Sequence, residues 1–184
     1  MINHIFPTSY YWIFDIPNFH EIQEYVKLKT KVDNTNFTWG DICKIDRIPL
    51  SLEETKSILL PSIELFANKF RDSQNIKIYD PWINLYKENF FQEVHDHKND
   101  IACVMFLNDG EEFAKFFFYN RYNNSVSYKL ENIFSDMSHN DVWYPDTSAG
   151  KVIFFPGTML HGVSPHKSDI IRKTLSFNID IMPL

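Results

Sequence analysis

The sequence predicts a mainly β protein with helices in its N-terminal part, an α+β fold class. From Ile76 onward, short apolar and β-branched runs alternate with Asn, Asp and Gly, which is typical of antiparallel sandwiches and barrels. Before that point, two stretches show the apolar spacing of amphipathic helices. Aromatic residues make up 16% of the chain against only 5 glycines, which favours a rigid two-layer interior.

Length, charge and cysteine content exclude several classes of protein. A chain of 184 residues suits one domain, in which residues 1–75 supply a supporting strand and helices and residues 76–184 the β-rich core. The formal net charge of -6 argues against nucleic acid as an obligatory partner. Cys43 and Cys103 are too few for a disulfide framework, and no apolar run reaches the ~20 residues of a membrane span. We therefore expect a cytoplasmic protein with no membrane partner; the oligomeric state is not indicated.

The N-terminal part is expected to contain one strand and two helices. Aromatic and β-branched residues at 10–14 predict the strand. Asn18 and Ser51, each followed three residues later by Glu, predict capping boxes at the starts of the two helices. Residues 33–40 are polar and predict a loop, and Pro61 is expected to kink or split the second helix.

The C-terminal part is expected to be a series of short strands. The predicted strands are residues 76–79, 82–86, 101–107, 113–119, 125–130, 152–155 and 174–181. The polar stretches 120–125 and 135–148 are candidate substrate lids. Helices should therefore precede strands in the chain.

Three histidines in this β-rich part form a candidate metal site. Alternate side chains of an extended strand point the same way, so His95 and His97 can offer imidazole nitrogens to one ion while Asp96 points elsewhere. His161 follows much later, after an apolar strand that ends at Pro156. Two ligands close in sequence and one distant ligand leave half of an octahedral ion's positions open, as non-haem iron oxygenases require.

Arg172, at the start of the last predicted strand, is a candidate anion anchor. A guanidinium can hold a carboxylate through two parallel hydrogen bonds. A surface salt bridge to Asp169 or Asp180 is the alternative. Because Arg172 follows the three histidines in the chain, we interpret the set as a metal site with an anion anchor beside it.

Several segments together resemble a known family. They are WINLY at 82–86, FQEVHDH at 91–97, GKVIFFP at 150–156, HGV at 161–163 and RKTLSFN at 172–178. These segments resemble the 2-oxoglutarate- and Fe(II)-dependent oxygenases, and most of all the prolyl-hydroxylase-like group found in phages and marine bacteria. The IFPT opening at 5–8 is also similar to that group, so the resemblance covers most of the chain in outline.

The resemblance implies a double-stranded β-helix, a jelly roll of cupin-like form, with Fe(II) held by a His-x-acid pair and a distal His. It also implies 2-oxoglutarate as a small-molecule co-substrate. By position, His95 and His161 match the ligand histidines, and Arg172 matches the anchor of the distal carboxylate. Thr174 and Ser176 match hydroxyls that assist this anchor, and their spacing places them on the same strand face as Arg172. No catalytic side chain is implied beyond the metal centre.

The chain departs from the family pattern at two positions. Where the family has an acidic ligand, this chain has His97, so the metal ligands are expected to be three histidines, with Asp96 as the alternative to His97. Phe106 stands where related enzymes often have a tyrosine that bonds the co-substrate. Asn84 and Tyr86, on the strand before the metal pair, either line the cofactor pocket or serve in packing.

The function implied by this resemblance is hydroxylation of a C–H bond, with succinate and CO2 as co-products. A prolyl or peptidyl target is the first expectation, and small-molecule substrates are also considered. Two alternatives stay open. One is a cupin-type three-histidine dioxygenase that does not use 2-oxoglutarate, and the other is a non-catalytic jelly-roll binding module.

Overall fold

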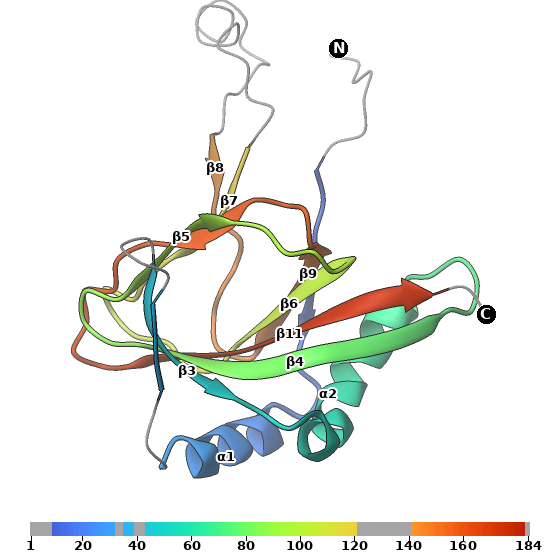
Figure 1. Cartoon of the computed structure of the whole chain (residues 1–184), viewed down its shortest axis with the longest axis horizontal. Coiled ribbons are helices and arrows are strands. Elements are labelled where there is room, and N and C mark those ends of the chain that lie inside the picture. Colours follow the sequence, from blue (N-terminus) through green and yellow to red (C-terminus); the bar gives the residue numbers. More distant parts are fainter. Residues whose placement is uncertain (1–8, 32–34, 39–42, 121–140, 183–184) are drawn as a thin grey trace, which may run out of the picture.

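A computed structural model describes residues 9–31, 35–38, 43–120 and 141–182, whose strands form one curled antiparallel sheet (Figure 1). In chain order the elements are β1 (Trp12–Asp15), α1 (Phe19–Lys29), β2 (Thr35–Thr38), β3 (Cys43–Pro49), α2 (Leu52–Ala67), β4 (Asn75–Tyr86), β5 (Phe91–His95), β6 (Ile101–Phe106), β7 (Phe116–Tyr119), β8 (Val142–Trp143), β9 (Lys151–Pro156), β10 (His161–Val163) and β11 (Arg172–Met182). The strand order is β1-β9-β6-β11-β4-β3-β5-β10-β7-β8, and β2 pairs with β3. The predicted mainly β class is therefore confirmed.

Strand β3 lies at the corner of the curl and joins two groups of strands. Its residues 46–49 pair with β4, whereas Cys43 and Lys44 pair with β5. The larger group, β1-β9-β6-β11-β4, has the helices beneath it, and the smaller group, β5-β10-β7-β8, lies at the top of Figure 1. One cavity is lined by residues of both groups, so the curl brings β5 and β10 over the concave face of β4 and β11.

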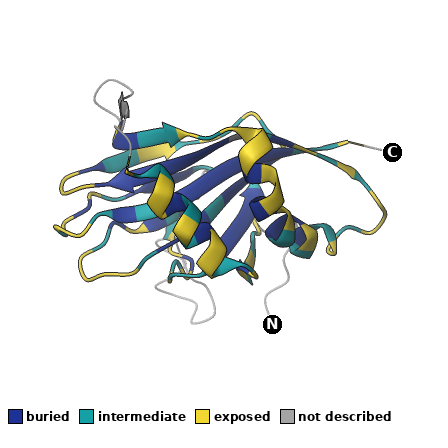
Figure 2. Cartoon of the chain, turned by 90° about the horizontal axis from the view of Figure 1, so that it is seen from below, coloured by how far each residue is buried: buried dark blue, intermediate teal, exposed yellow. Residues whose placement is uncertain are grey.

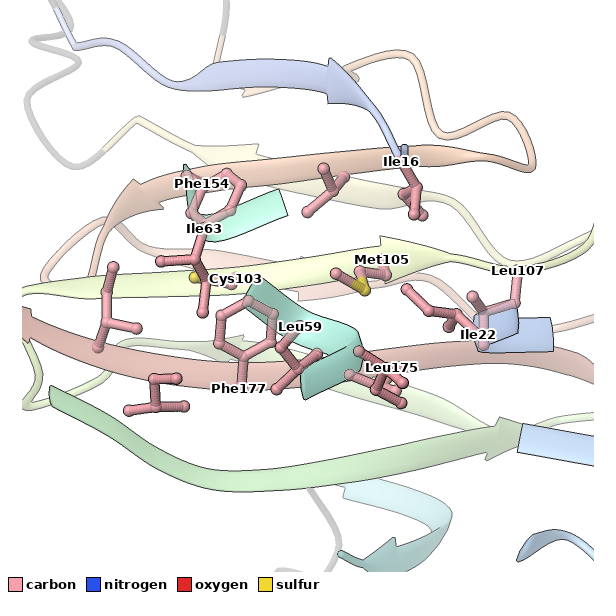
Figure 3. Packing of buried hydrophobic residues seen from close by; sticks show 14 of the residues in the cluster. Ile16, Ile22, Leu59, Ile63, Cys103, Met105, Leu107, Phe154, Leu175 and Phe177 are labelled. Carbon is pink, nitrogen blue, oxygen red and sulfur yellow. The ribbon is translucent and has the colours of Figure 1, made fainter. Parts of the chain in front are cut away.

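The two helices cover the convex face of the larger group, with their exposed sides outward (Figure 2). Alternate residues of a strand point to opposite faces, and the odd-numbered positions of β6 and β11 point toward the helices. In β4 the residues on this side are Ile76 and Ile78 before the bulge described below, and Ile83 and Leu85 after it. Figure 3 shows Leu59 and Ile63 of α2 meeting Cys103 and Phe177 of the sheet. This layer contains the following fully buried side chains: Ile22, Leu59, Phe66, Ile83, Met105, Val152, Phe154, Leu175, Phe177 and Ile179.

The concave face of the same strands is partly polar although it is buried. Along β11, Arg172, Thr174, Ser176 and Asn178 alternate with apolar residues of the convex face, and all four are buried. Burying polar groups costs free energy unless they find partners. A row of buried polar side chains on one strand face therefore marks a site rather than ordinary packing.

The structure corrects the predicted break between residues 79 and 82. Two strands were expected there, but β4 runs without interruption from Asn75 to Tyr86. The register with β11 shifts at this point, because Trp82 lies opposite Ser176 and Tyr79 lies opposite Asn178. The chain absorbs Pro81, which has no N–H to donate, in a bulge instead of ending the strand.

The prediction that helices precede strands is wrong in detail. Strand β3 lies between the two helices in the chain and was not predicted, and β2 lies inside the stretch 33–40 that was expected to be a loop. Strand β8 likewise lies within the predicted loop 135–148. These strands are short or polar, and pairing makes them extended: β2 with β3, β3 also with β4 and β5, and β8 with β7. The predicted strand 125–130 lies outside the described residues.

The two helices begin where predicted, with Asn18 and Ser51 at their N-cap positions, but the predicted capping hydrogen bonds and the predicted split at Pro61 are wrong. Neither Asn18 nor Ser51 makes a side-chain cap hydrogen bond; the Asn18 amide instead donates to Glu21 and to the carbonyl oxygen of Ile58, tying α1 to α2. Helix α2 continues through Pro61. Packing of its apolar side against the sheet offsets the lost hydrogen bond. Among the described residues, no helix is long and apolar enough to span a membrane.

Candidate metal and co-substrate site

The three predicted histidines meet at one end of the concave face. His95 is the last residue of β5, His161 is the first residue of β10, and the two lie opposite each other in the antiparallel register. The ring centroids of His95 and His161 are 4.3 Å apart, and that of His97 is 5.4 Å from His95 and 5.1 Å from His161. One potential ligand atom from each residue lies within 4.8 Å of the others, so the set can hold a metal ion.

His97 follows β5 and is positioned by a loop contact. Its backbone N–H donates to the carbonyl oxygen of Gly157 at 2.8 Å, and the N–H of Gly157 donates to that of Asp100 at 2.9 Å. A Cβ on Gly157 would lie 1.9 Å from the carbonyl oxygen of Asn99, so only glycine fits this close approach. The turn after β9 therefore positions His97 against the other two imidazoles.

The backbone also orients two of the imidazoles. Nδ1 of His95 bonds the carbonyl oxygen of Glu93 at 2.8 Å, and Nδ1 of His161 bonds that of Met159 at 2.9 Å. A carbonyl oxygen can only accept, so each Nδ1 is the donor and each Nε2 presents its lone pair. Such contacts to the second ring nitrogen are the usual support of metal-binding histidines.

Burial keeps these imidazoles neutral. It is the main cause that lowers the pKa of His97 to about 4 and the pKa values of His95 and His161 below the ordinary histidine range. The neighbouring imidazoles add to this effect for His97 and His161. A neutral imidazole is the form that binds a metal. Asp96, the alternative ligand, is exposed and does not belong to the group of converging ligand atoms.

Arg172 lies in the same cavity and is only 4% exposed. It pairs in register with Tyr86, and its guanidinium carbon lies 5.3 Å from the centroid of the Phe106 ring. Within the part of the chain that the structure describes, no hydrogen bond or salt bridge to the guanidinium is found. Burial lowers the pKa of Arg172, and the surface salt bridges with Asp169 and Asp180 considered from the sequence are not formed.

The polar residues between Arg172 and the histidines form a connected group. The Asn84 amide donates to the hydroxyl oxygens of Thr174 and Ser176, each at 3.3 Å. Its own carbonyl oxygen Oδ1 is buried and has no partner. Asn84, Thr174 and Ser176 line the cavity together with Tyr86. Of the two alternatives that the sequence left open for Asn84 and Tyr86, the structure therefore favours pocket lining over packing.

The structure adds Gln92, which sequence reasoning missed. Its amide bridges the Tyr86 hydroxyl at 3.1 Å and Nε2 of His95 at 3.1 Å. Strand alternation would place positions 92 and 95 on opposite faces. A register shift lets four residues of β5 lie opposite three of β10, because Gln92 pairs with Val163 and His95 pairs with His161. No feature of the local sequence predicts this bulge.

A curled antiparallel sheet whose concave face brings converging metal ligands beside a buried guanidinium is the arrangement expected of a 2-oxoglutarate- and Fe(II)-dependent oxygenase, although His97 stands here in place of the acidic ligand. The chain belongs to this family. Residues 80–178, more than half of the chain, match the family described as "Putative 2OG-Fe(II) oxygenase". It is therefore a 2-oxoglutarate-dependent non-haem iron oxygenase, a family that uses Fe(II) and 2-oxoglutarate.

Solved structures show the same fold. An oxidoreductase of the 2OG-Fe(II) oxygenase family from Burkholderia pseudomallei aligns with TM-score 0.69 and 13% identity, over 92% of this chain and 85% of that chain. A Pseudomonas putida prolyl-4-hydroxylase aligns with TM-score 0.62 and 11% identity, over 94% of each chain. HygX from Streptomyces hygroscopicus, with nickel and 2-oxoglutarate bound, aligns with TM-score 0.65 and 10% identity, over 94% of this chain and 83% of that chain. A search of the curated proteins finds no match.

Proposed function

We propose that the protein hydroxylates a C–H bond of a peptidyl or small-molecule substrate, with His95, His97 and His161 as the Fe(II) ligands and Arg172 as the anchor of 2-oxoglutarate. The observation that supports this most is the buried Arg172 guanidinium, which forms no hydrogen bond or salt bridge to an anion in the described part of the chain and shares a cavity with the three imidazoles; the charge of Asp109 acts on it without such a contact. A buried cation without a partner is costly, and a carboxylate that fits its planar fork offsets that cost.

The residues present fit both groups. Three neutral imidazoles with two fixed tautomers suit a divalent transition metal. The unpartnered carbonyl oxygen of Asn84 and the hydroxyls of Thr174 and Ser176 supply further polar contacts on the way from Arg172 to the metal position. Because all three ligands are neutral, the metal centre would keep its full positive charge, which favours binding of an anionic co-substrate at the metal.

The chemistry belongs to the bound groups. When bound, Fe(II) and 2-oxoglutarate activate dioxygen, with one oxygen atom ending in succinate, formed with CO2, and the other in the hydroxylated product. The residues of this chain orient the co-substrate, exclude water and hold the target bond near the metal. The apolar wall of the cavity excludes water and contains Phe106, Phe116 and Phe155.

A prolyl or peptidyl residue is our first choice of substrate. Its support is the fold similarity to the Pseudomonas putida prolyl-4-hydroxylase and to a Trichoplax adhaerens prolyl hydroxylase in complex with a hypoxia inducible factor oxygen degradation domain peptide fragment. We further propose that residues 1–184 form one domain and that the curled sheet of residues 76–184, with β3 at its corner, is a double-stranded β-helix.

Anaerobic titration tests the proposal and separates it from the alternatives. Fe(II) is added first, followed by 2-oxoglutarate, and the visible charge-transfer band of the chelated co-substrate is recorded. Metal-dependent binding of 2-oxoglutarate, followed by succinate formation in air, is expected. Metal binding without 2-oxoglutarate binding would instead favour the cupin-type dioxygenase. Failure to bind Fe(II) would favour the non-catalytic module.

A further inference from the structure

Gln92 connects the metal position to the co-substrate end of the cavity. The Tyr86 hydroxyl donates to Oε1 of Gln92, and Nε2 of Gln92 donates to Nε2 of His95, each at 3.1 Å. Tyr86 in turn lies opposite Arg172 in the register. A single chain of hydrogen bonds therefore runs from Tyr86 of β4, the register partner of Arg172, to one of the three imidazoles.

The direction of these hydrogen bonds follows from the chemistry of the groups. Nδ1 of His95 donates to the carbonyl oxygen of Glu93, so its Nε2 is an acceptor. Gln92 must then present its amide N–H to His95 and its carbonyl oxygen to Tyr86. The reverse orientation would place two acceptors, Oε1 of Gln92 and Nε2 of His95, against each other.

A metal ion on Nε2 of His95 excludes the hydrogen bond between Gln92 and the same nitrogen. Both use the single lone pair on Nε2 of His95, and the other ring nitrogen is already committed to Glu93. Binding of the ion must therefore release the Gln92 amide. If Oε1 remains on the Tyr86 hydroxyl, the released N–H group stays beside the metal position and needs a new acceptor.

We propose that Gln92 is a positioning residue with two successive partners. In the metal-free protein it caps His95, and in the metal-loaded protein it donates to the co-substrate carboxylate that lies at the metal. This second partner rests on the proposed function, whereas the first does not. The register shift in β5 that brings Gln92 beside His95 thus couples metal loading to co-substrate binding.

The test compares the wild-type protein with Gln92→Ala and Gln92→Glu in two anaerobic titrations. The first measures the Kd of Fe(II) without co-substrate, and the second measures the Kd of 2-oxoglutarate on the Fe(II)-loaded protein. Loss of the cap in Gln92→Ala should tighten Fe(II) binding about 2- to 10-fold, and loss of the donor should weaken 2-oxoglutarate binding roughly 10-fold or more.

Gln92→Glu separates positioning from packing because it keeps the shape of the side chain. Its carboxylate adds a negative charge beside the metal position and no longer donates. We expect tighter Fe(II) binding and still weaker 2-oxoglutarate binding. Gln23→Ala is the matched control, because Gln23 bonds the carbonyl oxygen of Leu107 and does not line the cavity; it should leave both constants unchanged.

Opposite changes in the two constants are the signature of the proposed role, since a merely structural residue would weaken both. Weaker Fe(II) binding by Gln92→Ala overturns the cap, and unchanged 2-oxoglutarate binding overturns the second partner. If the wild-type protein itself binds no 2-oxoglutarate, the proposed function and the second partner both fail. The Fe(II) titration then still tests whether Gln92 occupies Nε2 of His95 in the metal-free protein.

Discussion

Replacing Arg172 by methionine should have opposite effects on stability and on co-substrate binding. The guanidinium is buried, lies against the Phe106 ring and has no hydrogen-bonded anion within the described residues. Removing a buried charge that lacks a hydrogen-bonded counter-ion should raise the free energy of unfolding of the co-substrate-free protein by about 1–3 kcal/mol. Charge-assisted hydrogen bonds contribute about 1.5–3 kcal/mol, so 2-oxoglutarate binding should weaken roughly 10- to 150-fold.

Urea denaturation with and without 2-oxoglutarate measures both effects. A concentration ~100-fold above Kd should stabilise the metal-loaded wild-type protein by about 2.7 kcal/mol and the Arg172→Met variant much less. Lys173→Ala is the matched control, because this side chain points to the other face of β11. Wild-type affinity of Arg172→Met for 2-oxoglutarate would contradict the role of Arg172 as the anchor. A loss of stability as large as that of an ordinary core truncation would contradict the expected gain from removing the buried charge.

Three further outcomes are expected. His97→Ala should weaken Fe(II) binding at least about 10- to 100-fold, the cost already seen for outer-shell residues of metal sites, while Asp96→Asn should not change it, as measured by anaerobic metal titration. Because burial lowers the pKa of His97 to about 4, the unfolded chain binds this proton first as the pH falls. The contribution of His97 to the stability of the metal-free protein should thus be complete above the ordinary pKa of about 6.5 and be lost as the pH falls toward about 4. His97→Gln should remove this share of the pH dependence in urea denaturation, whereas the shares of His95 and His161 remain. Gly157→Ala should push the carbonyl of Asn99 away and weaken Fe(II) binding, whereas Phe177→Ala should lower the free energy of unfolding by about 3–5 kcal/mol and spare the metal site.

Most of the candidate site could be predicted from local spacing because strand periodicity is a local property. Alternation along one strand places Arg172, Thr174 and Ser176 on the same face, and the structure brings them together around one cavity. The choice of His97 over Asp96 as the converging side chain follows the same spacing, although His97 lies just beyond the end of β5.

Several elements could not be predicted, because distant pairing decides them. Strand β3 has little apolar alternation of its own, and it becomes extended only because β2, β4 and β5 pair with it. The chain continues through Pro81 and Pro61 because neighbouring strands and the sheet surface hold the backbone on either side. Local propensity is weaker than these tertiary contacts.

By itself, the sequence predicted the mainly β class, the resemblance to the oxygenase family and the three histidines and the arginine as candidate site residues. Only the tertiary structure decided that Gln92 faces His95, that the glycine after β9 holds His97, and that the Arg172 guanidinium is buried beside Phe106. The physical reason is that register shifts and close backbone approaches depend on which strands become neighbours. That choice is made by the packing of the whole sheet, and no short segment encodes it.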